Sequence, residues 1–149
     1  MSVLERKREL SKLEFYKNGQ EAHVKFTKFL LGNKIPKRGL YVYVIPGIDL
    51  TRQMMEEITA ANTIFVKKPE VCKPHETAEN NAKIKEREIH QNEAIIKSEQ
   101  AIQHIQWIID TVETVNPSDL DEIGEMLIRE SSLIKRWRDS YKVIDSEKS

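Results

Sequence analysis

The sequence is poor in cysteine, glycine and aromatic residues, and each shortage excludes a class of protein. A single cysteine, Cys72, rules out a disulfide within the chain and is typical of a reducing compartment. With five glycines in 149 residues, there is no glycine-rich loop to cradle phosphates. Aromatic residues make up 7% of the chain, and no apolar run approaches the roughly 20 residues of a membrane span. We therefore expect a cytoplasmic protein without a membrane segment.

Neither sign of charge is in excess. Lysine plus arginine and aspartate plus glutamate both number 24, so the formal net charge is zero. This balance argues against a surface built mainly for nucleic acid, although it is compatible with a local basic patch. Charged residues make up 32% of the chain, which is typical of long solvated helices. The length is that of one domain with a real core.

Apolar residues recur at spacings of three and four over the second half of the chain, which is the pattern of one helix face. One stripe consists of Ala94, Ser98, Ala101, Ile105, Ile108, Val112 and Val115. The next consists of Leu120, Ile123, Leu127, Ser131, Ile134, Trp137, Tyr141 and Ile144. Two such helices must hide their stripes against each other and against further helices. The pattern therefore predicts an all-α protein, a four-helix bundle.

Helix start and stop signals predict helices over 11–31, 47–66, 79–115 and 117–143. Ser11 and Glu14 are spaced as a capping box, and Gly32-Asn33 predicts a left-handed stop. Asn116 and Pro117 predict an N-cap and a first helical residue. The segment 67–78 contains two prolines and no period, so it is predicted to be a linker.

The segment from Tyr41 to Ile45 is β-branched and aromatic and has strand propensity. A single strand would have no partner here. We therefore expect an extended lead-in or a distorted first turn before Pro46, which fits best at a helix start.

Short connections favour antiparallel neighbours, so the simplest topology is up-down-up-down. The bundle would occupy 11–144, preceded by a charged tail or short helical extension at 1–10 and followed by a frayed end at 145–149. A second stripe of Ile95, Ile102 and Ile109 lies beside the first on the third helix. A helix that is apolar on two sides usually meets two partners, so we expect a homo-oligomer.

No catalytic or metal-binding constellation is present in the sequence. Cys72 and His75 have a ligand-like spacing, but no second pair completes a tetrahedral site. His90 and His104 would lie ~21 Å apart along the third helix, too far to share an ion, and are expected at its surface or boundary. We therefore expect a protein that is not an enzyme and has no metal and no cofactor.

Polar residues interrupt or flank the apolar stripes at Asn62, Arg87, Ser98, Glu130 and Ser131. They are expected to fix the helix register through buried hydrogen bonds or an ion pair. The alternative is a ligand pocket in the centre of the bundle.

The predicted topology sorts the basic residues into two poles, which are candidate surfaces for a nucleic acid or a partner protein. One pole would gather Lys67, Lys68, Lys73, Lys135, Arg136 and Arg138. The opposite pole would hold Lys34, Lys37 and Arg38, alongside acidic residues at the start of the last helix. The alternative is that these charges belong to solvated helix faces with local acidic partners.

The order of short motifs resembles a known group of proteins. The motifs are Ser11-Lys-Leu-Glu-Phe-Tyr16, Ile35-Pro-Lys-Arg38, Ala61-Asn62, Arg87 with Ala94 seven residues on, and Trp137-Arg-Asp-Ser140. Together they resemble the small four-helix-bundle proteins of bacterial phages and mobile elements. That group includes the accessory variability determinant of diversity-generating retroelements and the bundle proteins encoded in ribosomal RNA intervening sequences.

The resemblance implies a non-enzymatic bundle that assembles as a pentamer in the cytoplasm of a bacterial host. In retroelements such a ring binds the reverse transcriptase and its template RNA through a basic surface, to which Lys37 and Arg38 would belong by matching position. The zero net charge departs from the basic character of the RNA-binding members. An alternative function is a phage-encoded oligomer that binds a small nucleotide signal.

Overall fold

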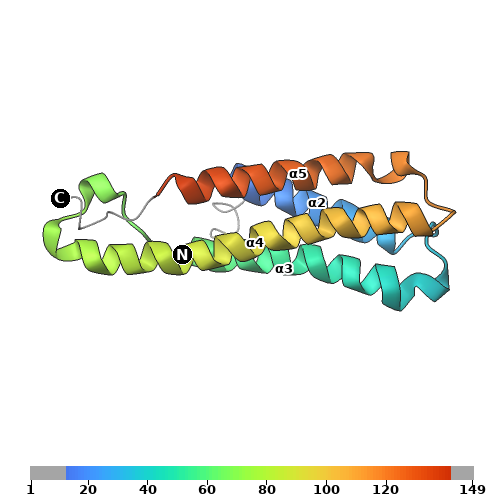
Figure 1. The fold of residues 1–149 in the computed structure, drawn as a ribbon, viewed down its shortest axis with the longest axis horizontal. Coiled ribbons are helices and arrows are strands. Elements are labelled where there is room, and N and C mark those ends of the chain that lie inside the picture. Colours follow the sequence, from blue (N-terminus) through green and yellow to red (C-terminus); the bar gives the residue numbers. More distant parts are fainter. Residues whose placement is uncertain (1–12, 142–149) are drawn as a thin grey trace, which may run out of the picture.

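The computed structural model describes residues 13–141, and this part of the chain is helical without strands. Its four helices are α2 (Glu14–Leu30), α3 (Ile45–Thr63), α4 (Thr77–Thr111) and α5 (Pro117–Asp139) (Figure 1). The prediction of an all-helical bundle is confirmed. The predicted tail at 1–10, Ser11 of the predicted capping box and the predicted frayed end at 145–149 lie outside the described residues.

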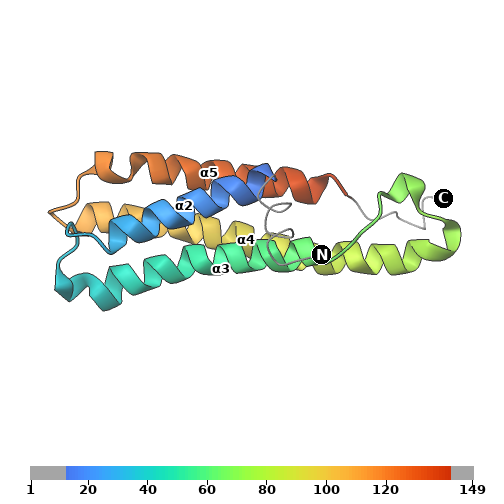
Figure 2. The same ribbon diagram turned by 180° about the vertical axis from the view of Figure 1, so that it is seen from behind.

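The helices run along one long axis (Figure 1). Helices α2 and α4 each pack against both α3 and α5. Figures 1 and 2 show the connections 31–39 and 112–116 together at one end, which we call the loop end. The connection 64–76 lies at the other end, the linker end.

All four helices contribute to one hydrophobic core. The largest fully buried apolar side chains are Phe26, Leu30, Met54, Ile58, Ile84, Ile108, Leu120, Leu127 and Ile134. Burying side chains of this size stabilises the fold by about 1.5–3 kcal/mol each. The second stripe of α4 also belongs to this core, because Ile95 is buried and Ile102 and Ile109 are partly buried against it. The stripe from which an oligomer was expected is therefore largely covered within one chain.

The start of α5 follows its sequence signals. Asn116 is the N-cap, Pro117 occupies the first turn, and Asp119 completes a capping box by accepting the backbone N–H of Asn116 at 2.9 Å. These groups satisfy N–H donors that the first helical turn leaves without partners.

The predicted left-handed stop at Gly32-Asn33 is wrong, because no residue between 13 and 141 has a positive φ. Helix α2 ends instead with ordinary right-handed turns, in which Leu31 N–H donates to Thr27 O at 2.9 Å and Gly32 N–H to Phe29 O at 3.1 Å. Helix α4 ends at Thr111 rather than at 115, and α5 ends at Asp139 rather than at 143.

A widened helical turn leads into α3. After a 3₁₀ turn at Lys37–Gly39, residues Leu40–Val44 form a π-helical turn that runs directly into the α-helix. Of the two alternatives for this segment, the distorted first turn is therefore the one observed. Pro46 has no N–H to donate to the carbonyl four residues earlier, so the ordinary α-helical pattern is already broken at this point.

Helix α4 extends past the end of α5, and the linker folds back along this extension (Figure 1). Two 3₁₀ turns, Pro69–Val71 and Pro74–Glu76, shape the linker. The buried Asn80 side chain fixes it to α4, because Oδ1 accepts the Lys67 N–H at 2.8 Å and Nδ2 donates to the Lys67 carbonyl at 2.9 Å.

Candidate functional site

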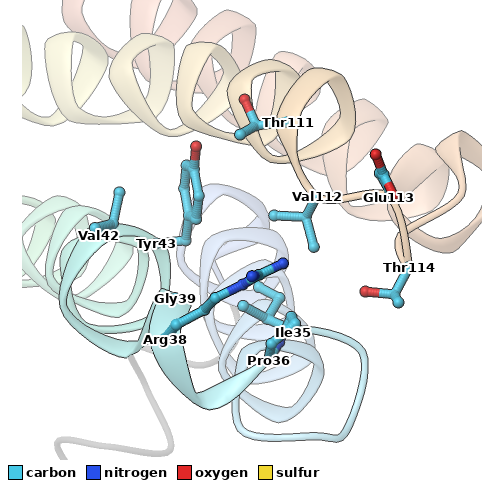
Figure 3. A pocket seen from close by; sticks show the side chains of 10 residues that line it. All are labelled: Ile35, Pro36, Arg38, Gly39, Val42, Tyr43, Thr111, Val112, Glu113 and Thr114. Atoms are coloured by element: carbon cyan, nitrogen blue, oxygen red, sulfur yellow. The ribbon is translucent and has the colours of Figure 1, made fainter.

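A pocket of about 410 Å³ opens at the loop end, between the 3₁₀ and π-helical turns and the end of α4 (Figure 3). Its walls are mainly apolar and include Ile35, Val42 and Val112. Figure 3 shows the Tyr43 ring directed toward α4 and the Arg38 side chain extending toward Val112. This volume lies within the range of small-ligand and side-chain pockets.

Close packing fixes the turns that form the pocket. A Cβ atom at Gly39 would lie 2.6 Å from Ile35 Cγ2, so only glycine fits there without a shift. His104 Nε2 lies 2.9 Å from the carbonyl oxygen of Tyr43, which ties the π-helical turn to α4. The expectation of a surface or boundary position for His104 is wrong: it is 5% exposed, because Gly47 lets α3 approach its ring.

The two loops of the loop end are also bonded to each other. Thr114 Oγ1 donates to the carbonyl of Lys34, and Lys34 Nζ lies 3.5 Å from Asp119 Oδ2. The acidic start of α5 therefore does lie alongside this basic loop, and it neutralises Lys34.

An exposed basic and aromatic group borders the pocket, and we call it the rim: Lys37, Arg38, Tyr41 and Val42. Tyr41 is 79% exposed and Val42 is 59% exposed, so two large hydrophobic side chains face the solvent here. Lys37 and Arg38 are exposed and have no ion pair within residues 13–141. The rim therefore offers two free positive charges beside an aromatic face.

The basic residues that were predicted to share one pole are divided between the linker and the last turns of α5. Lys67, Lys68 and Lys73 belong to the linker, which runs along the extension of α4 past the end of α5 (Figure 1). Lys67 pairs with Glu76, and Arg138 with Asp139 and Asn92. Lys68, Lys73, Lys135 and Arg136 are exposed.

A polar group lies inside the bundle around Glu130, which is fully buried on α5. Asn18 Nδ2 donates to Glu130 Oε1 at 3.2 Å and to the Met126 carbonyl at 2.9 Å. Burial, only partly offset by Asn18, raises the pKa of Glu130 to about 8, so the carboxyl is mostly protonated at pH 7. Its second oxygen, Oε2, has no partner.

Two buried serines bond α4 to α5. Ser98 Oγ donates to the Leu127 carbonyl at 2.8 Å, and Ser131 Oγ donates to Glu99 Oε1 at 2.8 Å. Arg87 is also buried, at 7% exposure. The prediction of a buried Asn62 is wrong, because it lies on the exposed side of the last turn of α3, about 100° around the helix from the buried Ala61.

Sequence reasoning missed three residues that the structure makes prominent: Asn18, Tyr43 and Gln91. Gln91 is fully buried on α4, and neither end of its amide has a partner. It lies seven residues before Ser98 and four after Arg87, so its position on the apolar stripe was the available signal.

The described part of the chain holds no group of three or more His, Cys, Asp or Glu side chains placed to bind a metal ion. Cys72 is a free, half-buried thiol. None of the helices between residues 13 and 141 combines the length and apolar character that crossing a membrane requires.

No protein-family model matches the sequence, and no curated protein or solved structure matches it. The resemblance to the bundle proteins of mobile elements therefore stays a hypothesis that depends on the short motifs.

Proposed function

We propose that the chain is a non-enzymatic accessory protein of a phage or mobile element, and that it binds its partner through the rim. The observation that carries this proposal is the pair of exposed, unpaired cations Lys37 and Arg38 beside the exposed Tyr41 ring. Cations hold phosphates, and an aromatic face stacks on an unpaired base, so this combination suits RNA. The family resemblance points to the same two basic residues independently of the structure.

By the same resemblance, the partner complex is a reverse transcriptase with its template RNA, and the accessory protein is a pentamer in the bacterial host cytoplasm. The proposal includes an antiparallel up-down-up-down order of the helices. Two contacts support that order. Phe15 near the start of α2 stacks on Trp137 near the end of α5, with 4.0 Å between ring centroids, and Lys34 after α2 meets Asp119 at the start of α5.

The test is RNA binding by the full chain, measured by fluorescence anisotropy with a labelled oligouridylate over a series of salt concentrations. The double variant Lys37→Glu/Arg38→Glu should bind at least about tenfold more weakly, because two phosphate contacts become repulsions. Its salt slope should also be shallower by about 1.4, which is ~0.7 for each lost contact with a single strand.

The matched control is Lys17→Glu/Lys85→Glu, which changes the net charge equally at two exposed positions on α2 and α4, away from the rim. It should weaken binding only a few-fold, through the long-range field. Equal weakening by both double variants would show that the rim has no special part in RNA binding.

A second candidate function, a binding protein for a small nucleotide signal, is favoured by the pocket itself. Arg38, Tyr43 and Thr111 bring a charge and two hydroxyl groups to a mainly apolar space of about 410 Å³. A nucleotide that binds there would raise the melting temperature through its affinity for the folded state alone. The shift should disappear in Arg38→Gln and persist in Lys37→Gln; a screen in which no nucleotide gives a shift would reject this candidate.

A further inference from the structure

A group of polar and aromatic side chains lies near the C-terminal end of α5, toward the linker end and far from the rim. It consists of Arg87 and Gln91 on α4 with the rings of Trp137 and Tyr141 from the end of α5. Neither the packing of the core nor the proposed function of the rim accounts for it.

The Arg87 side chain is buried without an ion pair within residues 13–141, and Glu88 attracts it only through a longer-range charge interaction. The residue is 7% exposed, its Nε is fully buried with no hydrogen-bond partner, and no carboxylate within residues 13–141 pairs with it. A buried charge is usually paired, because desolvating an ion costs several kcal/mol. Burial accordingly lowers the pKa of Arg87.

Aromatic rings supply part of the missing stabilisation. The guanidinium carbon lies 4.6 Å from the centroid of Tyr141 and 5.6 Å from that of Trp137. Trp137 is in turn held by stacking on Phe15. These contacts hold the guanidinium, but no hydrogen bond from any of its N–H groups is found within residues 13–141. The hydrogen-bonding edge of a fixed cation is therefore left for another group.

One helical turn further into the bundle, Gln91 shares this face of α4 and is fully buried with both amide ends unpartnered. The site thus combines a guanidinium whose Nε is buried without a partner with an unsatisfied amide one helical turn away.

We propose that this group, which we call the Arg87 site, binds a phosphate group, held by the edge of the Arg87 guanidinium. Phosphate matches the guanidinium fork with two parallel hydrogen bonds. A phosphate monoester carries about −1.5 to −2 charges at pH 7, so it offsets the buried cation better than a carboxylate does. The phosphate is either the free inorganic ion or an ester, and an ester with a ring gains a stacking contact with Tyr141.

The test is isothermal titration calorimetry of the full chain at low salt with inorganic phosphate, phenyl phosphate and acetate. We expect both phosphates to bind and acetate to bind at least about tenfold more weakly, since it has one charge. Tighter binding of phenyl phosphate would identify an aromatic ester as the ligand class, and equal binding would identify the inorganic ion. Acetate binding as tight as that of phosphate, or no heat from either phosphate at ~10 mM, would overturn the proposal.

Two variants assign the binding to Arg87. Arg87→Gln should weaken phosphate binding at least about tenfold, because the charge and the fork are both lost. Lys85→Gln, an exposed neighbour on α4 that lies away from the site, should change it less than about twofold. Unchanged binding in Arg87→Gln would place the phosphate elsewhere and refute the assignment.

Thermal unfolding first checks that Arg87→Gln is folded. If it is not, Arg87→Lys keeps the charge but loses the two-pronged geometry and should bind phosphate with intermediate affinity. A direct readout in the unaltered protein is the Arg87 Nε–H resonance, which should shift on addition of phosphate. An unmoved resonance at saturating phosphate would also refute the assignment. Rim variants leave these results unchanged, so the two proposals fail separately.

Discussion

Replacing Glu130 by glutamine should stabilise the protein at neutral pH, in contrast to most substitutions of a fully buried residue. The folded state holds the carboxyl with a pKa of about 8, against an ordinary value of 4.5. Folding must therefore keep a proton on Glu130 that the unfolded chain releases above pH 4.5. Because the folded pKa is raised, this carboxyl does not destabilise the fold below about pH 4.5. Between pH 4.5 and pH 8, stability is lost progressively as the pH rises.

The two pKa values set the size of the effect. Relative to an unperturbed glutamate, Glu130 costs ~3 kcal/mol of unfolding free energy at pH 7 and ~5 kcal/mol at pH 9, but under ~1 kcal/mol at pH 5. Glutamine has the shape of the protonated acid and has no charge to lose. The amide oxygen of the variant keeps the acceptor position for Asn18 Nδ2, which lies 3.2 Å from Glu130 Oε1 in the wild type.

The assay is urea unfolding of the wild type and Glu130→Gln at pH 5, 7 and 9, with the difference in unfolding free energy taken at each pH. The difference should grow by about 2–4 kcal/mol from pH 5 to pH 9 in favour of the variant. Glu125→Gln, an exposed position on α5, is the control and should change stability by less than ~0.5 kcal/mol throughout. A difference that does not vary with pH would refute the reasoning.

Three further predictions concern the core and its edges. Gly19→Ala should destabilise the fold by about 1–3 kcal/mol in chemical unfolding, because its Cβ would lie 2.8 Å from Met55 Sδ and 2.9 Å from Glu130 Cδ. The control is Gly124→Ala, whose Cβ would have nothing within 4 Å, and it should stabilise the fold by up to ~1 kcal/mol. Trp137→Ala should lower the unfolding free energy by about 3 kcal/mol, because its packing on Phe15 is lost. Trp107 is 56% exposed, so Trp107→Ala should lower it by less than ~0.5 kcal/mol. Equal losses in the two variants would contradict the packing of Trp137. Burial and the nearby charge of Arg52 lower the pKa of His23. The neutral imidazole therefore stabilises the fold above pH 6.5, and this stability is lost as the pH falls below 6.5. In urea unfolding, His23→Gln should lose less stability than the wild type between pH 7 and pH 5.

The helices and most of the core were predictable from the sequence, because a heptad stripe leaves little choice about which face of a long helix is buried. The stripe on α5 is an example: Leu120, Leu127 and Ile134 are all essentially unexposed. Capping signals were equally reliable where the sequence offers several at once, as at Asn116 and Pro117. The Gly32-Asn33 signal failed because glycine permits a left-handed residue without requiring one.

The candidate sites were predictable only in part, because burial depends on how neighbouring helices are placed. Asn62 and Arg87 both flank apolar stripes, yet Asn62 is exposed and Arg87 is buried. The two rings at the end of α5 close over Arg87, while Asn62 lies on the outer side of the last turn of α3. The pocket at the loop end depends on a π-helical turn, for which no reliable sequence pattern exists.

Native mass spectrometry of the protein purified without nuclease tests the proposal that the bundle is an oligomeric accessory protein with RNA on its rim. We expect a pentamer with additional nucleic-acid mass, and the Lys37→Glu/Arg38→Glu variant should lose this mass while it stays pentameric. A bare monomer from the wild type, without any nucleic acid, would refute the proposed function.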